Sequence, residues 1–355
     1  MRRYILALIC GISLSLSFGF ASDGTVYNFL SLPNSSAVSA LGGANVSLQN
    51  KDVTMAVQNP ALLGLADDRS ISLSYFNYVS DVQYGSALYG QAIDSLSWWG
   101  VGFTYLNYGT FDAYSEYDVN EGSFSAGDAC LSAIYARRLF RHFIAGLSLK
   151  PVYSYIDNYT SFGLAVDLGA NYYLPDYDFS AGFTVRNFGV QITPYEDTRE
   201  NLPCDVQLGV SKRLAHAPFR FSLTYDRLNH WNLDYVKDGS LYDATETGIS
   251  SDYKRSVSWG NMLLRHFIVG VEFLPSKNFS LMAAYNHRRN EEFSMDNIGS
   301  GSGFSFGGNI KVYKFSLGVS YAIYGPSGNV LGISLSSSLN SFRKSDSAHT
   351  AGIDL

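Results

Sequence analysis

The 355-residue sequence is poor in charged residues, cysteine and long apolar stretches. Asp, Glu, Lys and Arg make up 16% of the chain, whereas about a quarter is usual in soluble globular domains. Three cysteines are too few for a disulfide framework. The net charge of -6 gives no basic face for nucleic acid. After Phe20 no run is long and apolar enough to cross a bilayer as a helix, which excludes a helical membrane protein.

Aromatic residues and glycine are abundant instead. The chain has 26 Tyr, 23 Phe and 33 Gly. This mixture suits strands that carry apolar side chains on one face and small or polar side chains on the other. The composition therefore favours a β-rich protein with one apolar and one wet surface.

The chain begins like a secretory signal peptide. Arg2 and Arg3 precede the apolar run Tyr4–Phe20, and Gly19 and Ala21 are small residues at the two positions that a signal peptidase reads. We predict a signal peptide over residues 1–21, cleaved after Ala21. The alternative, an uncleaved anchor, would need a spanning run of about 20 apolar residues.

From about Ser70 onward, apolar residues alternate with small or polar ones, which is typical of strands with two different faces. Counting to Leu335 predicts about fourteen strands, many of them around ten residues long. Short Pro-containing turns separate consecutive strands and indicate hairpins. The fold class predicted is all-β, a transmembrane antiparallel barrel. Clear examples of alternation start at Phe143, Leu164, Val206, Phe219, Phe304 and Phe315.

Soluble β-sandwiches also alternate and are the competing interpretation. Sandwich strands are commonly about five or six residues long, whereas a tilted membrane strand needs about nine to eleven. The polar face also carries charges, which a dry sandwich core would not accept but a wet barrel lumen can. These inward-facing charged residues are Lys150, Asp167, Arg186, Glu272 and Lys311.

The chain divides into four parts by pattern. Residues 22–66 lack alternation and are predicted to form a plug inside the barrel, residues 67–342 form the barrel, and residues 343–355 form a polar C-terminal tail. Phe342 is expected to replace the terminal aromatic residue with which many barrels end. Phe111–Gly122 and Leu228–Ser256 are interpreted as long loops facing outside the cell. In the second loop the candidate partner contacts are Trp231, Tyr235 and Tyr242.

The sequence holds no recognisable catalytic or metal-binding pattern. Its six histidines lack zinc spacing, and no nucleophile elbow or phosphate-binding loop occurs. We therefore expect no enzyme activity, no cofactor and no metal. The repeat of Arg141-His142-Phe143-Ile144 as Arg265-His266-Phe267-Ile268 is interpreted as a reused hairpin start. Cys130 and Cys204 could pair in an oxidising periplasm, but their wide separation favours free thiols.

Several short segments resemble a known family. They include Asn59-Pro60-Ala61 after Ala40-Leu41-Gly42-Gly43, then Arg265-His266-Phe267 and Ala284-Tyr285-Asn286-His287-Arg288-Arg289. Their order resembles the PorQ/PorV family of type IX secretion proteins, which are distant relatives of the FadL fatty-acid transporters. In the wider family an Asn-Pro-Ala element lies in the N-terminal hatch, which here corresponds to Asn59, Pro60 and Ala61.

The resemblance implies a FadL-like barrel of fourteen strands in the outer membrane of Bacteroidota. It implies a function as the membrane anchor of a surface attachment complex, in which processed cargo is joined to lipopolysaccharide by a sortase-like partner. A FadL-like channel for hydrophobic small molecules is the alternative. An outer-membrane hydrolase, with a site assembled from distant residues, is a weaker third hypothesis.

Overall fold

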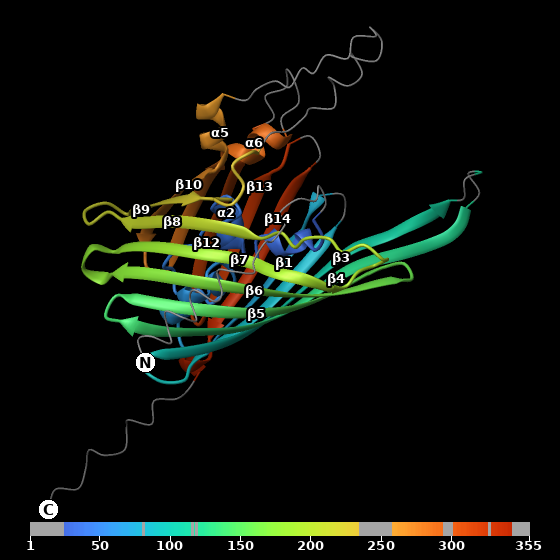
Figure 1. Ribbon diagram of the computed structural model, residues 1–355. Coiled ribbons are helices and arrows are strands. Elements are labelled where there is room, and N and C mark those ends of the chain that lie inside the picture. Colours follow the sequence, from blue (N-terminus) through green and yellow to red (C-terminus); the bar gives the residue numbers. More distant parts are fainter. Residues whose placement is uncertain are drawn as a thin grey trace, which may run out of the picture.

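The computed structural model describes residues 25–79, 82–114, 117, 120–233, 258–293, 301–325 and 328–342. Within them, fourteen antiparallel strands form a closed barrel (Figure 1). β1 (Ser70–Asn77) pairs with β2 (Gln83–Ala92) on one side and with β14 (Asn329–Ser338) on the other, which closes the ring. The predicted fourteen-stranded barrel is confirmed, and the sandwich alternative is wrong.

The remaining strands follow one another around the ring in chain order, because each hairpin places a strand beside the one before it. They are β3 (Ser97–Tyr114), β4 (Asn120–Phe140), β5 (Phe143–Ile156), β6 (Tyr159–Leu174), β7 (Phe179–Thr193), β8 (Asp205–Arg213), β9 (Phe219–Tyr225), β10 (Phe267–Ser276), β11 (Phe279–Asn286), β12 (Phe304–Val312) and β13 (Phe315–Ile323).

The two faces of the wall differ as the alternation predicts. On β5, Leu147 and Leu149 are exposed outside, while Ser148 and Lys150 are buried inside. A band of exposed Phe, Leu, Val and Tyr side chains continues this pattern around the barrel. Burying such a band in hydrocarbon is favourable, whereas its exposure to water is unfavourable. The outer surface is therefore built to contact lipid.

One predicted loop is largely strand. The range Phe111–Gly122 was expected to be irregular, but β3 continues to Tyr114 and β4 resumes at Asn120, and Figure 1 shows this hairpin projecting from the barrel. Phe111 stacks on Phe124 across the pair, with ring centroids 5.3 Å apart. Cross-strand hydrogen bonds and aromatic pairing extend the hairpin despite its polar composition.

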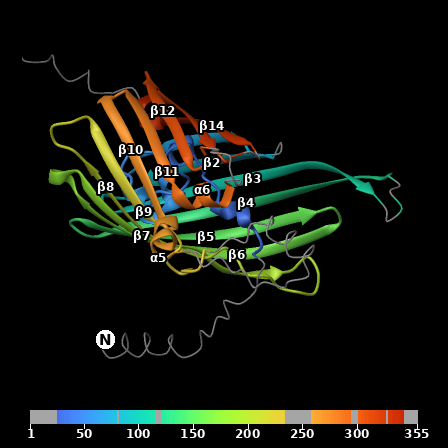
Figure 2. The same ribbon diagram turned by 90° about the horizontal axis from the view of Figure 1, so that it is seen from above.

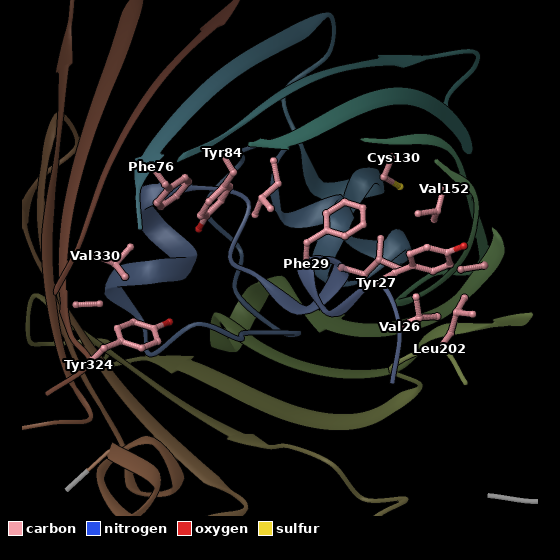
Figure 3. Packing of buried hydrophobic residues seen from close by; sticks show 14 residues of the cluster. Val26, Tyr27, Phe29, Phe76, Tyr84, Cys130, Val152, Leu202, Tyr324 and Val330 are labelled. Carbon is pink, nitrogen blue, oxygen red and sulfur yellow. The ribbon is translucent and has the colours of Figure 1, made fainter. Parts of the chain in front are cut away.

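Residues 25–66, called the inner segment below, lie within the barrel (Figure 2). They form η1 (Asn28–Ser31), α2 (Ser36–Ala40), α3 (Met55–Gln58) and η2 (Pro60–Leu65). α2 packs against β11, β12, β13 and β14, whereas η2 packs against β3, β4, β5 and β6. Figure 3 shows Tyr27 and Phe29 of this segment pointing toward Val152 and Cys130 of the wall.

Short helices complete the chain at the barrel ends. α5 (Trp259–Arg265) and α6 (His287–Phe293) pack against each other, and η4 (Pro175–Tyr177) and η5 (Leu339–Phe342) lie at turns. Phe342 of η5 contacts the ring of Phe315, with centroids 5.8 Å apart. Among the described residues, no helix has the length and apolar character needed to span a membrane.

Candidate functional site: a polar vestibule at the loop end

The two ends of the barrel are built differently. At one end, called the turn end, connections such as Arg141–His142 and Lys277–Asn278 are short, and Leu339 N donates to Arg69 O where the barrel begins and ends. The other end, called the loop end, carries the longer connections, including 194–204, 226–266 and 287–303. Outer-membrane barrels place short turns in the periplasm and long loops outside the cell. The loop end is therefore the extracellular one.

Glycines on the barrel wall make room for the inner segment. Gly146 of β5 and Gly169 of β6 are cross-strand partners, and both lie against the Asn59-Pro60 peptide. A Cβ on Gly146 would overlap the Pro60 backbone, and one on Gly169 would overlap the Asn59 side chain. Only glycine permits this close approach of two backbones.

Asn59 fixes the inner segment in place. Its Nδ2 donates to Val46 O at 2.9 Å and to Ala170 O at 3.1 Å, and its Oδ1 accepts from Ala61 N at 3.1 Å. The side chain is fully buried. Asn59 therefore caps η2 and joins it both to Val46 of the inner segment and to Ala170 of β6. The residues of the predicted hatch motif, Asn59, Pro60 and Ala61, lie inside the barrel against its wall.

A buried ion pair crosses the lumenal face of β5 and β6. Lys150 and Asp167 form it, with side chains that are 3% and 0% exposed. Asn187 completes the group: its N donates to Asp167 Oδ1 at 2.8 Å, and its Oδ1 accepts from Lys150 Nζ at 3.2 Å. Asn187 has a φ of 54° at an irregularity in β7, which turns its amide toward the pair.

Arg186 connects the wall to the inner segment. Its Nη1 donates to Gln58 Oε1 at 3.1 Å, and its Nη2 donates to Leu30 O at 3.2 Å. The side chain is buried. Of the charged residues expected on the inner face, Lys150, Asp167, Arg186 and Glu272 are buried there. Lys311 differs, because it lies exposed at the end of β12 near the turn end.

Above the inner segment, a cavity of about 420 Å³ opens toward the loop end. We call it the outer vestibule. Its floor is formed by residues around Leu32 and Gly43, and its walls by residues of β7, β8, β10 and β11 together with α6 and the segment that follows β9. Seven charged side chains dominate the lining. They are Arg186, Asp205, Asp226, Arg227, Arg288, Arg289 and Glu292.

Ion pairs link several of the charged side chains of the vestibule. Arg288 bonds Asp226 at 2.9 Å and Glu292 at 3.6 Å, and Gln207 Nε2 donates to Asp226 Oδ1 at 2.7 Å. Burial alone would raise the pKa of Asp226, but the Arg288 guanidinium outweighs burial and holds this pKa below its ordinary value. Burial alone would lower the pKa of Arg288, but the Asp226 and Glu292 carboxylates outweigh burial and raise this pKa. Such a surface solvates polar groups and repels hydrocarbon.

Arg289 holds the floor of the vestibule. Its Nη2 donates to Gly42 O at 3.1 Å, its Nη1 donates to Ser305 Oγ at 3.0 Å, and its guanidinium lies 4.2 Å from the centre of the Tyr324 ring. Gly42 has a φ of 92°, a conformation that other residues rarely adopt. This arginine therefore ties the Gly42-Gly43 turn to the wall at the mouth of the lumen.

α5 and α6 cover one side of the mouth. Arg265 of α5 bonds Glu291 of α6 at 3.2 Å. His287 Nε2 donates to Asn261 Oδ1 at 2.7 Å, and the Tyr285 hydroxyl lies 3.3 Å from His287 Nδ1. Both ring nitrogens are thus satisfied when the imidazole is neutral.

Acidification is expected to loosen the contact between α5 and α6. Burial lowers the pKa of His287 below its ordinary value of 6.5, and this outweighs the nearby Glu291. The folded chain therefore binds fewer protons than the unfolded chain just below pH 6.5, so this contribution to stability is present above that pH and lost as the pH falls. The protection factors of residues 259–265 against hydrogen exchange, which take account of the slower intrinsic exchange at low pH, should fall on acidification in the native protein and lose that dependence in His287→Asn. An unchanged pH profile in the variant would contradict the prediction.

The predicted partner-contact residues are only partly described. Trp231 is half exposed near α5 at the loop end, whereas Tyr235 and Tyr242 lie outside the described residues. The repeated Arg-His-Phe-Ile segments do not share a location. His142 lies at the turn end before β5, and His266 lies at the loop end before β10. The two copies therefore form no common site.

Sequence reasoning missed most of the vestibule. Asp205 begins β8 and Asp226 follows β9, at the open end of one hairpin, whereas Arg288 lies in α6. The one available signal was that Asp205 shares the inward alternation of Gln207 and Gly209. Cys130 and Cys204 are free thiols, as their separation favoured. In the described ranges, no three His, Cys, Asp or Glu side chains form a group that could hold a metal ion.

Comparison with known proteins gives matches at the level of structure. No family model and no curated protein sequence matches the chain. The toluene transporter TbuX of Ralstonia pickettii aligns with 87% of this chain and 99% of its own, at a TM-score of 0.54 and 12% identity. The toluene transporter TodX of Pseudomonas putida aligns with 86% and 97%, at 0.53 and 12%. A FadL homologue of Pseudomonas aeruginosa aligns with 86% and 98%, at 0.51 and 8%.

These identities are low, so the likeness concerns the fold. These three structures match the barrel over nearly their whole length, and none of the three belongs by its name to the PorQ/PorV group, which stays a prediction. Combined with the apolar outer band, the match gives a plain conclusion. The chain has the fold of the FadL-like barrels and is a protein of the bacterial outer membrane.

Proposed function

We propose that this protein is a non-enzymatic anchor in the outer membrane, whose extracellular loops hold a partner. One observation carries the proposal: the inner segment fills the lumen, and the space left above it is polar and charged. A hydrophobic solute would have to displace the water and ion pairs of the vestibule without replacing their interactions. The geometry therefore favours a membrane anchor over a channel through which a hydrophobic solute passes.

The resemblance to PorQ/PorV proteins gives the class of partner. We infer that the loop end supports an attachment complex of a type IX secretion system, in contact with lipopolysaccharide and a sortase-like protein. The projecting β3–β4 hairpin and the loop helix α6 offer the surfaces for such contacts. The barrel positions these surfaces at the cell exterior, because its apolar band holds it in the membrane.

Deletion of the gene tests the anchoring function. We expect secreted cargo to lose its processing and its attachment to the surface, and plasmid-borne native protein to restore both. The measurements are immunoblots of cell-surface and medium fractions for a cargo protein. Cargo that is processed and attached normally in the deletion strain would overturn the proposal.

The second candidate is a channel for hydrophobic small molecules, and its support is the fold shared with TbuX and TodX, which are toluene transporters. Uptake of a radiolabelled fatty acid and of labelled toluene by intact cells separates the two functions. Under the anchor proposal, uptake is equal in the native and deletion strains. Uptake that disappears on deletion and returns with the native gene would establish the channel instead.

A further inference from the structure

Two neighbouring strands of the barrel wall, β8 and β9, are short. β9 has seven residues and β8 has nine, whereas β6 and β7 have 16 and 15. A tilted strand needs about nine to eleven residues to cross the hydrocarbon of a membrane. β9 is too short by that measure, so the lipid-facing surface above Tyr225 must be supplied by residues outside the strands.

A stack of aromatic rings continues the lipid-facing surface upward from β9. Tyr225 has the same outward alternation as Phe221 and Leu223. The His266 ring stacks on Tyr225 at 5.1 Å between centroids, and the Trp231 ring stacks on His266 at 5.4 Å. Trp259 follows at 6.3 Å. We call these four rings the aromatic column.

The ring of His266 is held in the column by a hydrogen bond within the protein. His266 is buried, and its Nδ1 lies 2.8 Å from Asp226 O, an acceptor to which it can donate. The neighbouring Tyr and Trp rings are of the amphipathic aromatic type that membrane interfaces favour.

α5 extends the same apolar surface beyond the column. Its buried side carries Met262 and Arg265, while Trp259 is 69% and Leu264 is 53% exposed. Below it, Leu228 N donates to Val206 O at 2.8 Å, so Leu228 sits beside the lipid-facing end of β8. In water these exposed side chains would be an unfavourable apolar patch, whereas beside the lipid band they continue it.

We propose that α5 and the aromatic column lie in the outer leaflet of the membrane and complete the barrel wall above β8 and β9. This assigns Trp231 to contact with lipid rather than to contact with a protein partner. The occupant follows from continuity, because the column begins on a strand face that already contacts lipid. The inference is independent of whether the protein anchors a complex or transports a solute.

Fluorescence of single-tryptophan variants tests the proposal in the full-length protein folded into phosphatidylcholine vesicles. The chain has four Trp, of which Trp98 and Trp99 lie at the turn end of β3. One variant keeps Trp259 and carries Phe at the other three positions. The matched control keeps Trp99, which is 40% exposed on the wall. Folding is checked by heat-dependent gel mobility.

Phosphatidylcholine brominated near the top of its acyl chains should quench Trp259 to a similar fractional extent as Trp99, and aqueous iodide should quench Trp259 weakly. Lipid brominated near the chain ends should quench it less than the shallow probe does. Strong quenching by iodide without quenching by either brominated lipid would overturn the proposal, since it would place α5 in water. A variant that keeps Trp231 gives a second, independent reading of the column.

Discussion

Replacing Asp167 with alanine is expected to destabilise the barrel by about 3–5 kcal/mol, because it leaves the Lys150 ammonium buried without its counter-charge. Lys150 is 3% exposed in its side chain and has Asn187 as its other polar partner. A neutral amide oxygen cannot replace the carboxylate. Urea unfolding in vesicles, followed by tryptophan emission, measures the change.

The control for this prediction is an exposed ion pair on the same barrel. Arg213 and Asp178 lie 3.9 Å apart with side chains 45% and 34% exposed, so Asp178→Ala should cost at most about 1 kcal/mol. The double variant Lys150→Met, Asp167→Leu should recover much of the lost stability, because it removes both charges. Equal losses in Asp167→Ala and Asp178→Ala would show that the buried pair is not needed.

Replacing Gly146 with alanine is expected to force the inner segment off the wall. The added Cβ would overlap the Pro60 backbone, which cannot rotate away as a flexible side chain could. Overpacking of this kind costs about 1–3 kcal/mol. The segment should then become accessible, so limited proteolysis of the folded protein should cut within residues 25–66 faster than in the native protein.

Gly260→Ala is the matched control, because no heavy atom lies near its added Cβ in α5. That variant should keep the native rate of proteolysis and the native unfolding midpoint. If Gly146→Ala is as resistant to protease as the native protein, the close packing of Pro60 on β5 does not hold the segment in place.

The strands could be read from the sequence because lipid and lumen impose opposite requirements on alternate residues. Leu147 and Lys150, for example, differ in both burial and chemistry, and the alternation reveals this without any tertiary information. The extended β3–β4 hairpin could not be read in the same way. Its outer part projects beyond the neighbouring strands (Figure 1), and no apolar alternation is required there, where Phe111 pairs with Phe124.

The site was harder to predict because it depends on where strands end. The β8–β9 hairpin brings Asp205 near Asp226, but Arg288 reaches Asp226 from α6, and nothing local marks it as their neighbour. The position of the inner segment was foreseeable in outline, since Asn59-Pro60-Ala61 precedes the barrel and lacks alternation. The glycines that receive it, Gly146 and Gly169, were visible only as small residues on the inward face.

The course of the inner segment constrains how the molecule is assembled. Val26 N donates to Asn201 O at the loop end, and the chain leaves the lumen at the turn end through Arg69. The polypeptide thus traverses the ring from one opening to the other. If the inner segment is in place before β1 pairs with β14, no threading is needed. If the barrel closes first, the inner segment must be threaded through a lumen that contains ion pairs. Closing the seam after the inner segment is in place is therefore the order of assembly that avoids threading.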